Sequence, residues 1–301
     1  MTRTVILLVI AMGVWRHAPD QQTPVFRAGT SAVMVDVSVK TRSGRVVTGL
    51  TAPDFVIQDN GVRQDVAAVS YGKLPIDVTV GLDVSTSVTG PLLDQLRRAV
   101  TTLMRDLRKD DRLKLMSFNT WMTRTVDFTT DIARVEKALR AVTAGGGTAL
   151  FDALSVALTS ATDPDRRQLI VFFTDGSDSS STTSRELMSQ IVDRTRATVS
   201  FVVLPSASNF LPVSPAAAGI VRSRMQIDPT IQRVATESGG SVMFAAGELG
   251  LAFLRALDAF RSAYVLLYAP RGVERGGFHT IDVQVGRPDV VVLARRGYFG
   301  G

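Results

Sequence analysis

The sequence predicts an α/β fold, a doubly wound and mostly parallel Rossmann-like sheet, joined to a small antiparallel β domain. Strand and helix patterns alternate from residue 75 to residue 262, as expected for a parallel sheet covered on both faces. The segments 168–175 and 198–204 are almost continuously apolar, which is typical of strands buried on both faces. Outside this region, short segments alternate with the two-residue period of half-buried strands.

Apolar runs and the turns between them predict the elements of the α/β region in order. Strands are expected at 76–83, 112–118, 168–175, 198–204 and 241–245, with a short edge strand near 124–128, and helices at 91–108, 131–142, 149–161, 184–196, 229–238 and 248–262. Leu150, Leu154 and Leu158 recur at helical spacing after Thr148, so we expect that face of the helix to pack in the core.

The two flanks of this region are predicted to form one discontinuous β domain. Residues Val33 to Val39 and His279 to Val285 alternate between apolar and other residues. Further short strands fit 46–50, 55–59, 64–71, 264–269 and 290–294, punctuated by Ser-Gly, Asn-Gly and Arg-Gly turns. Because so small a set of strands folds poorly alone, we expect segments 28–74 and 263–301 to pack together beside the domain at 75–262.

Three separated polar motifs carry the functional signal. The run Asp83-Val84-Ser85-Thr86-Ser87 follows one apolar strand, Asp175 follows another, and Thr148 ends a Gly-Gly-Gly-Thr run before a helix. The carboxyl edge of an open α/β sheet is where ligands bind, and both aspartates are expected there.

The oxygen donors of these motifs suit a hard divalent cation better than zinc or copper. Singly, each motif is also an ordinary turn or helix cap. Together they predict a metal site formed by Asp83, Ser85, Ser87, Thr148 and Asp175.

These motifs resemble the metal-ion-dependent adhesion site of von Willebrand factor A domains, the module also found as the inserted domain of integrins. The resemblance implies that Ser85, Ser87 and Thr148 are hydroxyl ligands and that Asp83 and Asp175 are the acidic ones. It also implies bound Mg²⁺, or Mn²⁺ or Ca²⁺, with some carboxylate contacts through water and one open coordination position. An Asp or Glu side chain of a protein partner would complete that position.

The resemblance extends beyond the metal site. The whole mature chain is similar to exported von Willebrand factor A-related proteins of acidobacteria, in the segments Asp54-Phe55 to Asp59-Asn60-Gly61 and Ala294-Arg295-Arg296-Gly297-Tyr298. This second resemblance implies no known reaction.

Residues 1–19 are expected to be a signal peptide, with Arg3 before an apolar run from Val5 to Trp15 that is too short to span a bilayer. An uncleaved anchor is the alternative. The chain contains no cysteine, which excludes disulfides and a lipoprotein anchor. We therefore expect an exported protein, periplasmic, at the cell surface or secreted, with no other membrane span. Its net charge of +6 is scattered along the chain, so no nucleic-acid partner is expected.

A long loop is expected between the strand at 198–204 and the helix at 229–238. Residues 205–227 follow the strand at 198–204 and offer Phe210, Leu211, Arg222 and Arg224 as partner contacts, although an insertion without a role is the alternative. The leading hypothesis is a metal-dependent binding module, and the alternative is a scaffold component of an envelope complex. A Mg²⁺-dependent hydrolase is least favoured, because the chain has two histidines, no cysteine and no G-x-S-x-G motif. We expect no enzymatic activity.

Overall fold

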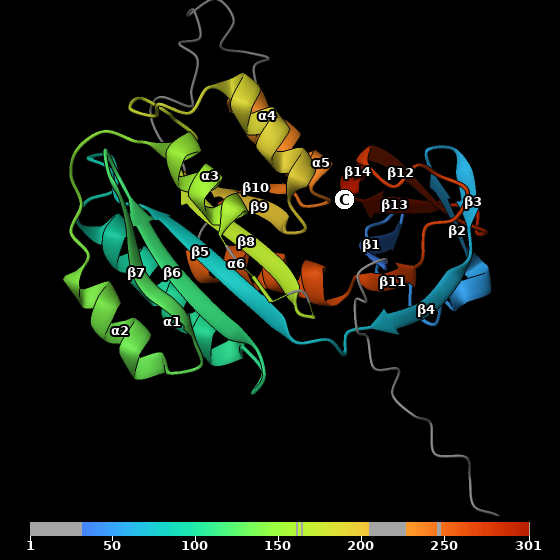
Figure 1. Cartoon of the computed structure of the whole chain (residues 1–301). Helices are drawn as coiled ribbons and strands as arrows, with labels where there is room; N and C mark the ends of the chain where they lie inside the picture. Colours follow the sequence, from blue (N-terminus) through green and yellow to red (C-terminus); the bar gives the residue numbers. More distant parts are fainter. Residues whose placement is uncertain (1–31, 161, 164, 205–226, 246–247, 301) are drawn as a thin grey trace, which may run out of the picture.

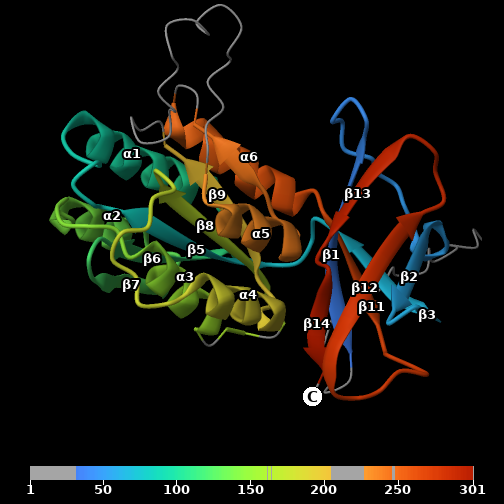
Figure 2. The ribbon, with the colours of Figure 1, turned by 90° about the horizontal axis from the view of Figure 1, so that it is seen from above.

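The computed structural model of the protein describes residues 32–160, 162–163, 165–204, 227–245 and 248–300. The expected signal segment 1–19 and the expected partner contacts Phe210, Leu211, Arg222 and Arg224 lie outside these residues. The described chain forms an α/β unit and, beside it, a β sandwich, as two views at right angles show (Figures 1 and 2). Among the described helices, none has the length and apolar character that crossing a membrane requires.

The α/β unit is built on a six-stranded sheet in the order β10-β9-β8-β5-β6-β7. Its strands are β5 (Ile76–Asp83), β6 (Arg112–Phe118), β7 (Met122–Thr129), β8 (Arg167–Thr174), β9 (Thr198–Val203) and β10 (Val242–Phe244). Neighbouring strands are parallel except at the edge, where β7 runs antiparallel to β6. The chain order reverses between β5 and β8, which makes the space above their carboxyl ends the switch point of the sheet.

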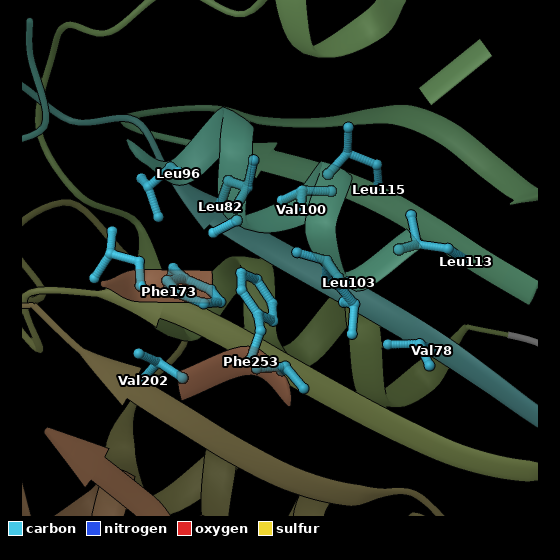
Figure 3. Packing of buried hydrophobic residues seen from close by; sticks show 14 of the residues in the cluster. Val78, Leu82, Leu96, Val100, Leu103, Leu113, Leu115, Phe173, Val202 and Phe253 are labelled. Carbon is cyan, nitrogen blue, oxygen red and sulfur yellow. The ribbon is translucent and has the colours of Figure 1, made fainter. Parts of the chain in front are cut away.

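Helices cover both faces of this sheet. They are α1 (Pro91–Asp106), α2 (Ile132–Ala141), α3 (Leu150–Thr159), α4 (Arg185–Arg194), α5 (Pro229–Glu237) and α6 (Leu249–Arg261). The first, second and sixth pack on one face, and the other three on the opposite face. Figure 3 shows the first of these cores, where the rings of Phe173 and Phe253 lie 3.6 Å apart between centroids. Leu150, Leu154 and Leu158 are buried in the second core, as the helical spacing predicts.

The β sandwich consists of two four-stranded sheets, β13-β1-β11-β4 and β14-β12-β2-β3. Its strands are β1 (Val33–Thr41), β2 (Phe55–Asp59), β3 (Val62–Gln64), β4 (Val66–Tyr71), β11 (Tyr264–Tyr268), β12 (Gly277–Val285), β13 (Val290–Ala294) and β14 (Gly297–Gly300), with a 3-10 helix at Ala52–Asp54. Strands from the two flanks of the sequence pair with each other, β1 with β11 and β13, and β2 with β12. The predicted fold class is therefore confirmed, and the exact domain boundaries stay predictions.

Two predicted elements of the sandwich are wrong. Residues 46–50 form no strand, and only Val46 makes an isolated bridge, to Lys40. The Tyr264 hydroxyl replaces the missing sheet partner, because it donates to the carbonyl of Val47 at 3.0 Å and accepts from the amide of Leu50 at 3.1 Å. The expected strand at 64–71 is divided into β3 and β4. The strand β14 was not predicted, because its glycines hide the alternation of apolar and polar residues.

A buried carboxyl group joins the two flanks inside the sandwich. Asp59 is fully buried and accepts hydrogen bonds from the hydroxyls of Tyr268 at 2.9 Å and Tyr298 at 2.8 Å. Its other oxygen lies 2.8 Å from Nδ1 of His279. Burial, followed by the hydrogen bond to Asp59, raises the pKa of both tyrosines. The motif residues of the two flanks therefore meet in one polar cluster.

The residues after Asp59 make a two-residue turn of the sandwich. Asn60 and Gly61 both have positive φ, 47° and 79°, between β2 and β3. A two-residue hairpin with this backbone favours Asn-Gly, so the motif has a structural explanation. The Asn60 side chain also accepts a hydrogen bond from the amide of Thr280 at 2.8 Å.

We predict that Asp59→Ala destabilises the protein by about 3–5 kcal/mol, because it leaves Tyr268, Tyr298 and His279 of the C-terminal flank without their partner on the N-terminal flank. Urea denaturation followed by circular dichroism measures this change. Asp65→Ala is the matched control, since its side chain is 94% exposed and should change the unfolding midpoint little. Equal midpoints for the two variants would show that the cluster does not hold the flanks together.

Candidate metal centre

The two predicted acidic ligands lie at the ends of neighbouring parallel strands. Asp83 is the last residue of β5 and is fully buried, and Asp175 directly follows β8 and is 5% exposed. The strands pair in register up to Leu82 and Phe173, so both carboxyl groups occupy the carboxyl edge of the sheet. This edge is the switch point between β5 and β8.

Backbone hydrogen bonds hold the three motifs together. The carbonyl of Val84 accepts from the amide of Gly145 at 2.8 Å, and the carbonyl of Gly146 accepts from the amide of Thr86 at 3.1 Å. The Thr86 hydroxyl donates to the same carbonyl at 2.9 Å, so this residue connects loops although it is not an expected ligand. On the other side, the carbonyl of Thr148 accepts from the amides of residues 179 and 180 at 2.9 and 3.0 Å. The motifs thus form one hydrogen-bonded unit.

The glycines before Thr148 permit the close approach of the second motif to the third. A Cβ atom on Gly147 would lie 2.3 Å from the hydroxyl oxygen of Ser180, and Gly146 has a φ of +81°. A side chain at Gly147 would push the second motif away from the third, and a side chain at Gly146 would be strained. Gly146 and Gly147 are therefore part of the geometry of the centre.

The Asp83 carboxyl group is fixed at both oxygens. One accepts from the amide of Ser85 at 2.9 Å, and the other accepts from the hydroxyl of Thr174 at 2.9 Å. Burial raises the pKa of Asp83, the hydrogen bonds from Ser85 and Thr174 act in the opposite direction, and the charge of Asp175 raises it again. A cation beside the two carboxylates would offset both the burial and the repulsion.

The hydroxyl groups fit the same kind of ion. The Ser85 and Ser87 hydroxyl oxygens lie 3.1 Å apart. Adjacent oxygens of an octahedral Mg²⁺ site with bonds of about 2.1 Å lie about 3.0 Å apart, so this pair has suitable spacing. Ser85 and Thr148 are buried, whereas Ser87 is exposed.

The donor set depends on these hydroxyls. Within the part of the chain that the structure describes, no group of three or more His, Cys, Asp or Glu side chains is placed to hold a metal. Two carboxylates and several neutral oxygens are a set that a hard cation accepts and that zinc does not favour.

Sequence reasoning missed the roles of Thr174 and Asp178. The Thr174 hydroxyl is fully buried, and besides donating to Asp83 it accepts from the amide of Gly176 at 3.0 Å. The Asp178 carboxylate caps α3 from a distant loop, because it accepts from the amides of Leu150 at 2.9 Å and Phe151 at 3.4 Å. Nothing in the local sequence reveals either contact, since both join segments far apart in the chain.

An exposed aromatic side chain beside the centre was also missed. Trp121 is 78% exposed and follows β6 in the turn to β7. The same turn contacts the glycine run, because Thr120 accepts from the amide of Gly147 at 2.8 Å and the carbonyl of Asn119 accepts from the amide of Ala149 at 2.7 Å. A tryptophan within the polar run Asn119-Thr120-Trp121 is the sequence signal that could have found it.

Comparisons with known proteins bear on the fold of the α/β unit. Residues 78–177 match the family model of the von Willebrand factor type A domain. Inter-alpha-trypsin inhibitor heavy chain H2 of Mus musculus is 30% identical over 163 residues, which cover 49% of this chain and 16% of that protein. The match thus spans about a sixth of the length of that relative.

One solved structure shows the same fold, and a second is similar to part of the chain. A von Willebrand factor type A protein from Catenulispora acidiphila has a TM-score of 0.50 at 12% identity, covering 89% of this chain and 73% of that chain. An aerotolerance-related membrane protein from Bacteroides fragilis has a TM-score of 0.48 at 18% identity, covering 62% of this chain and 98% of that chain. The resemblance to exported acidobacterial proteins stays a prediction. With its strand order, its helices on both faces and the family match at residues 78–177, the α/β unit has the fold of von Willebrand factor type A proteins.

Proposed function

We propose that this chain is a divalent-metal-dependent protein-binding module. Asp83, Ser85, Ser87, Thr148 and Asp175 would hold Mg²⁺, or Mn²⁺ or Ca²⁺, and the bound ion would capture an Asp or Glu side chain of a protein partner. The observation that carries the proposal is that hydrogen bonds join the three motifs around two carboxyl groups at the switch point of the sheet. The general use of von Willebrand factor type A domains as interaction modules supports it.

The protein residues define what such a centre does. Hydrogen bonds from Ser85 and Thr174 orient the Asp83 carboxylate, so its position does not depend on the ion. The remaining protein donors include neutral hydroxyls, and a dication held partly by neutral oxygens keeps positive charge for a further anionic ligand. A carboxylate of a partner is such a ligand, which gives the centre a preference for acidic side chains.

The surface around the centre would supply specificity. Trp121 lies exposed beside the glycine run, and large aromatic side chains dominate the energetics of many interfaces. The segment 205–227 begins after β9 at the same edge of the sheet, and its residues Phe210, Leu211, Arg222 and Arg224 remain predicted contacts. We propose that the module acts outside the cytoplasm, on the basis of the signal-like segment 1–19.

Asp83→Ala is predicted to abolish saturable binding of Mg²⁺ and Mn²⁺, because it removes the carboxylate on which the three motifs converge. Calorimetric titration of each ion into wild type and variant measures this. Asp65→Ala, which removes an exposed carboxylate of the sandwich, is the control and should bind as wild type does. Saturable binding retained in Asp83→Ala would refute the proposed ligand set.

Replacing Thr174 by Val should lower metal affinity by roughly ten- to a hundredfold, the usual effect of removing a group that orients a metal ligand. The shape of the side chain is kept, but the hydroxyl that donates to Asp83 is lost. The measurement is the same titration, with thermal unfolding to check that the variant is folded. Unchanged affinity would mean that Thr174 serves only the turn at Gly176.

Trp121→Ala should weaken partner binding by roughly 2 kcal/mol or more while leaving metal affinity unchanged. The assay is surface plasmon resonance with a partner that is retained in Mg²⁺ and released by a chelator. Phe244→Ala, at an exposed phenylalanine of β10, is the aromatic control. Equal loss in both variants would argue against a contact at Trp121, and retention insensitive to chelator would favour the scaffold alternative.

A further inference from the structure

A cavity lies at the opposite end of the sheet from the candidate metal centre. Its volume is about 930 Å³, and it lies where the α/β unit meets the sandwich, with lining residues from both. Figure 1 shows the chain crossing this boundary between β4 and β5. Small-molecule sites have volumes of about 300–1,000 Å³, so the cavity is large enough for a small organic ligand.

The lining of this cavity is strongly basic. Six arginines and three carboxylates line it, an excess of three positive charges: Arg166, Arg167, Arg194, Arg196, Arg275 and Arg295 against Asp36, Asp163 and Glu274. Among the described residues, no carboxylate lies within 4.0 Å of four of these arginines, Arg194, Arg196, Arg275 and Arg295. Their charges are therefore not neutralised by direct ion pairs.

Arg295 is the clearest example of an arginine in this lining without an ion pair. Its guanidinium group donates to the carbonyl of Gly297 at 2.6 Å and to the carbonyl of Thr195, which are neutral acceptors. Burial lowers the pKa of Arg295 to about 10, the charge of Asp36 acts against this, and the charge of Arg196 adds to it. An anion in the cavity would stabilise this guanidinium directly.

Two buried side chains in the lining have nitrogen atoms without a hydrogen-bond partner. Arg167 is 2% exposed, pairs with Asp36 at 2.6 Å and donates to the carbonyl of Phe260 at 2.6 Å, yet its Nη1 has no acceptor. His279 is 1% exposed, and its Nε2 likewise has no partner. Buried polar groups without a partner are rare in folded proteins, and an oxyanion would supply an acceptor to Arg167.

We propose that this cavity binds a small molecule that carries two or three negative charges on phosphate or carboxylate groups. Guanidinium groups pair with both kinds of oxyanion through two parallel hydrogen bonds. The buried Arg167 and the half-buried Arg295 form the inner part of the site, and the exposed Arg194 and Arg196 form its mouth. The site is independent of the metal centre, which lies at the other edge of the sheet.

The test is calorimetric titration of pyrophosphate and of citrate into the full chain without divalent cations, so that the metal centre takes no part. We expect saturable one-site binding, weakened about tenfold or more in Arg295→Gln and in Arg196→Gln, because each removes charged hydrogen bonds to the anion. Tighter binding of pyrophosphate assigns phosphate chemistry, and tighter binding of citrate assigns carboxylate chemistry. Thermal unfolding checks that the variants fold. Because Arg196 is exposed, its replacement leaves the core intact.

Arg134→Gln is the matched control, because it removes the same charge from an exposed position on α2 outside the cavity. It should bind both anions as wild type does. Absence of saturable binding in wild type would overturn the proposal. Equal weakening in Arg134→Gln would also overturn it, since it would show attraction by net charge rather than a site.

Discussion

The reversal of strand order between β5 and β8 is the constraint on which the candidate metal centre depends. Because these two parallel strands are neighbours, their last residues meet at one edge of the sheet. After β5 the chain continues into α1 on one face, and after β8 into α4 on the other, so the two loops separate above the sheet. Asp83 and Asp175 occupy the base of this space, and the glycine run before Thr148 closes its side.

The two ends of the sheet carry opposite charge, and each is organised by contacts between distant segments. At the carboxyl edge, buried carboxyl groups are surrounded by hydroxyls and amides. At the amino ends of the strands, Arg167 connects β8 to Asp36 of the sandwich and to the last turn of α6. Asp77 of β5 pairs there with Arg112 and Arg166. Within the described residues, the sandwich thus lies at the basic end of the sheet and not at the acidic end.

Sequence patterns were sufficient for the α/β elements because burial on both faces makes segments such as 198–204 almost continuously apolar. Sequence patterns also predicted that Asp83 and Asp175 lie close together, because residues that follow neighbouring parallel strands lie at the same edge of the sheet. They could not reveal Thr174 against Asp83, Asp178 as the cap of α3, or the Tyr264 hydroxyl replacing a strand, because each contact joins residues far apart in the chain. The arginines were interpreted as a scattered surface charge, yet six of them line one cavity.

The most direct test of this account is anomalous diffraction from crystals of the protein grown with Mn²⁺. We expect a single strong anomalous peak at the carboxyl edge of the sheet, in contact with the hydroxyl oxygens of Ser85, Ser87 and Thr148 and beside Asp83 and Asp175. A fully occupied ion elsewhere, with no peak between these residues, would contradict the claim that the switch point of the sheet is a metal centre.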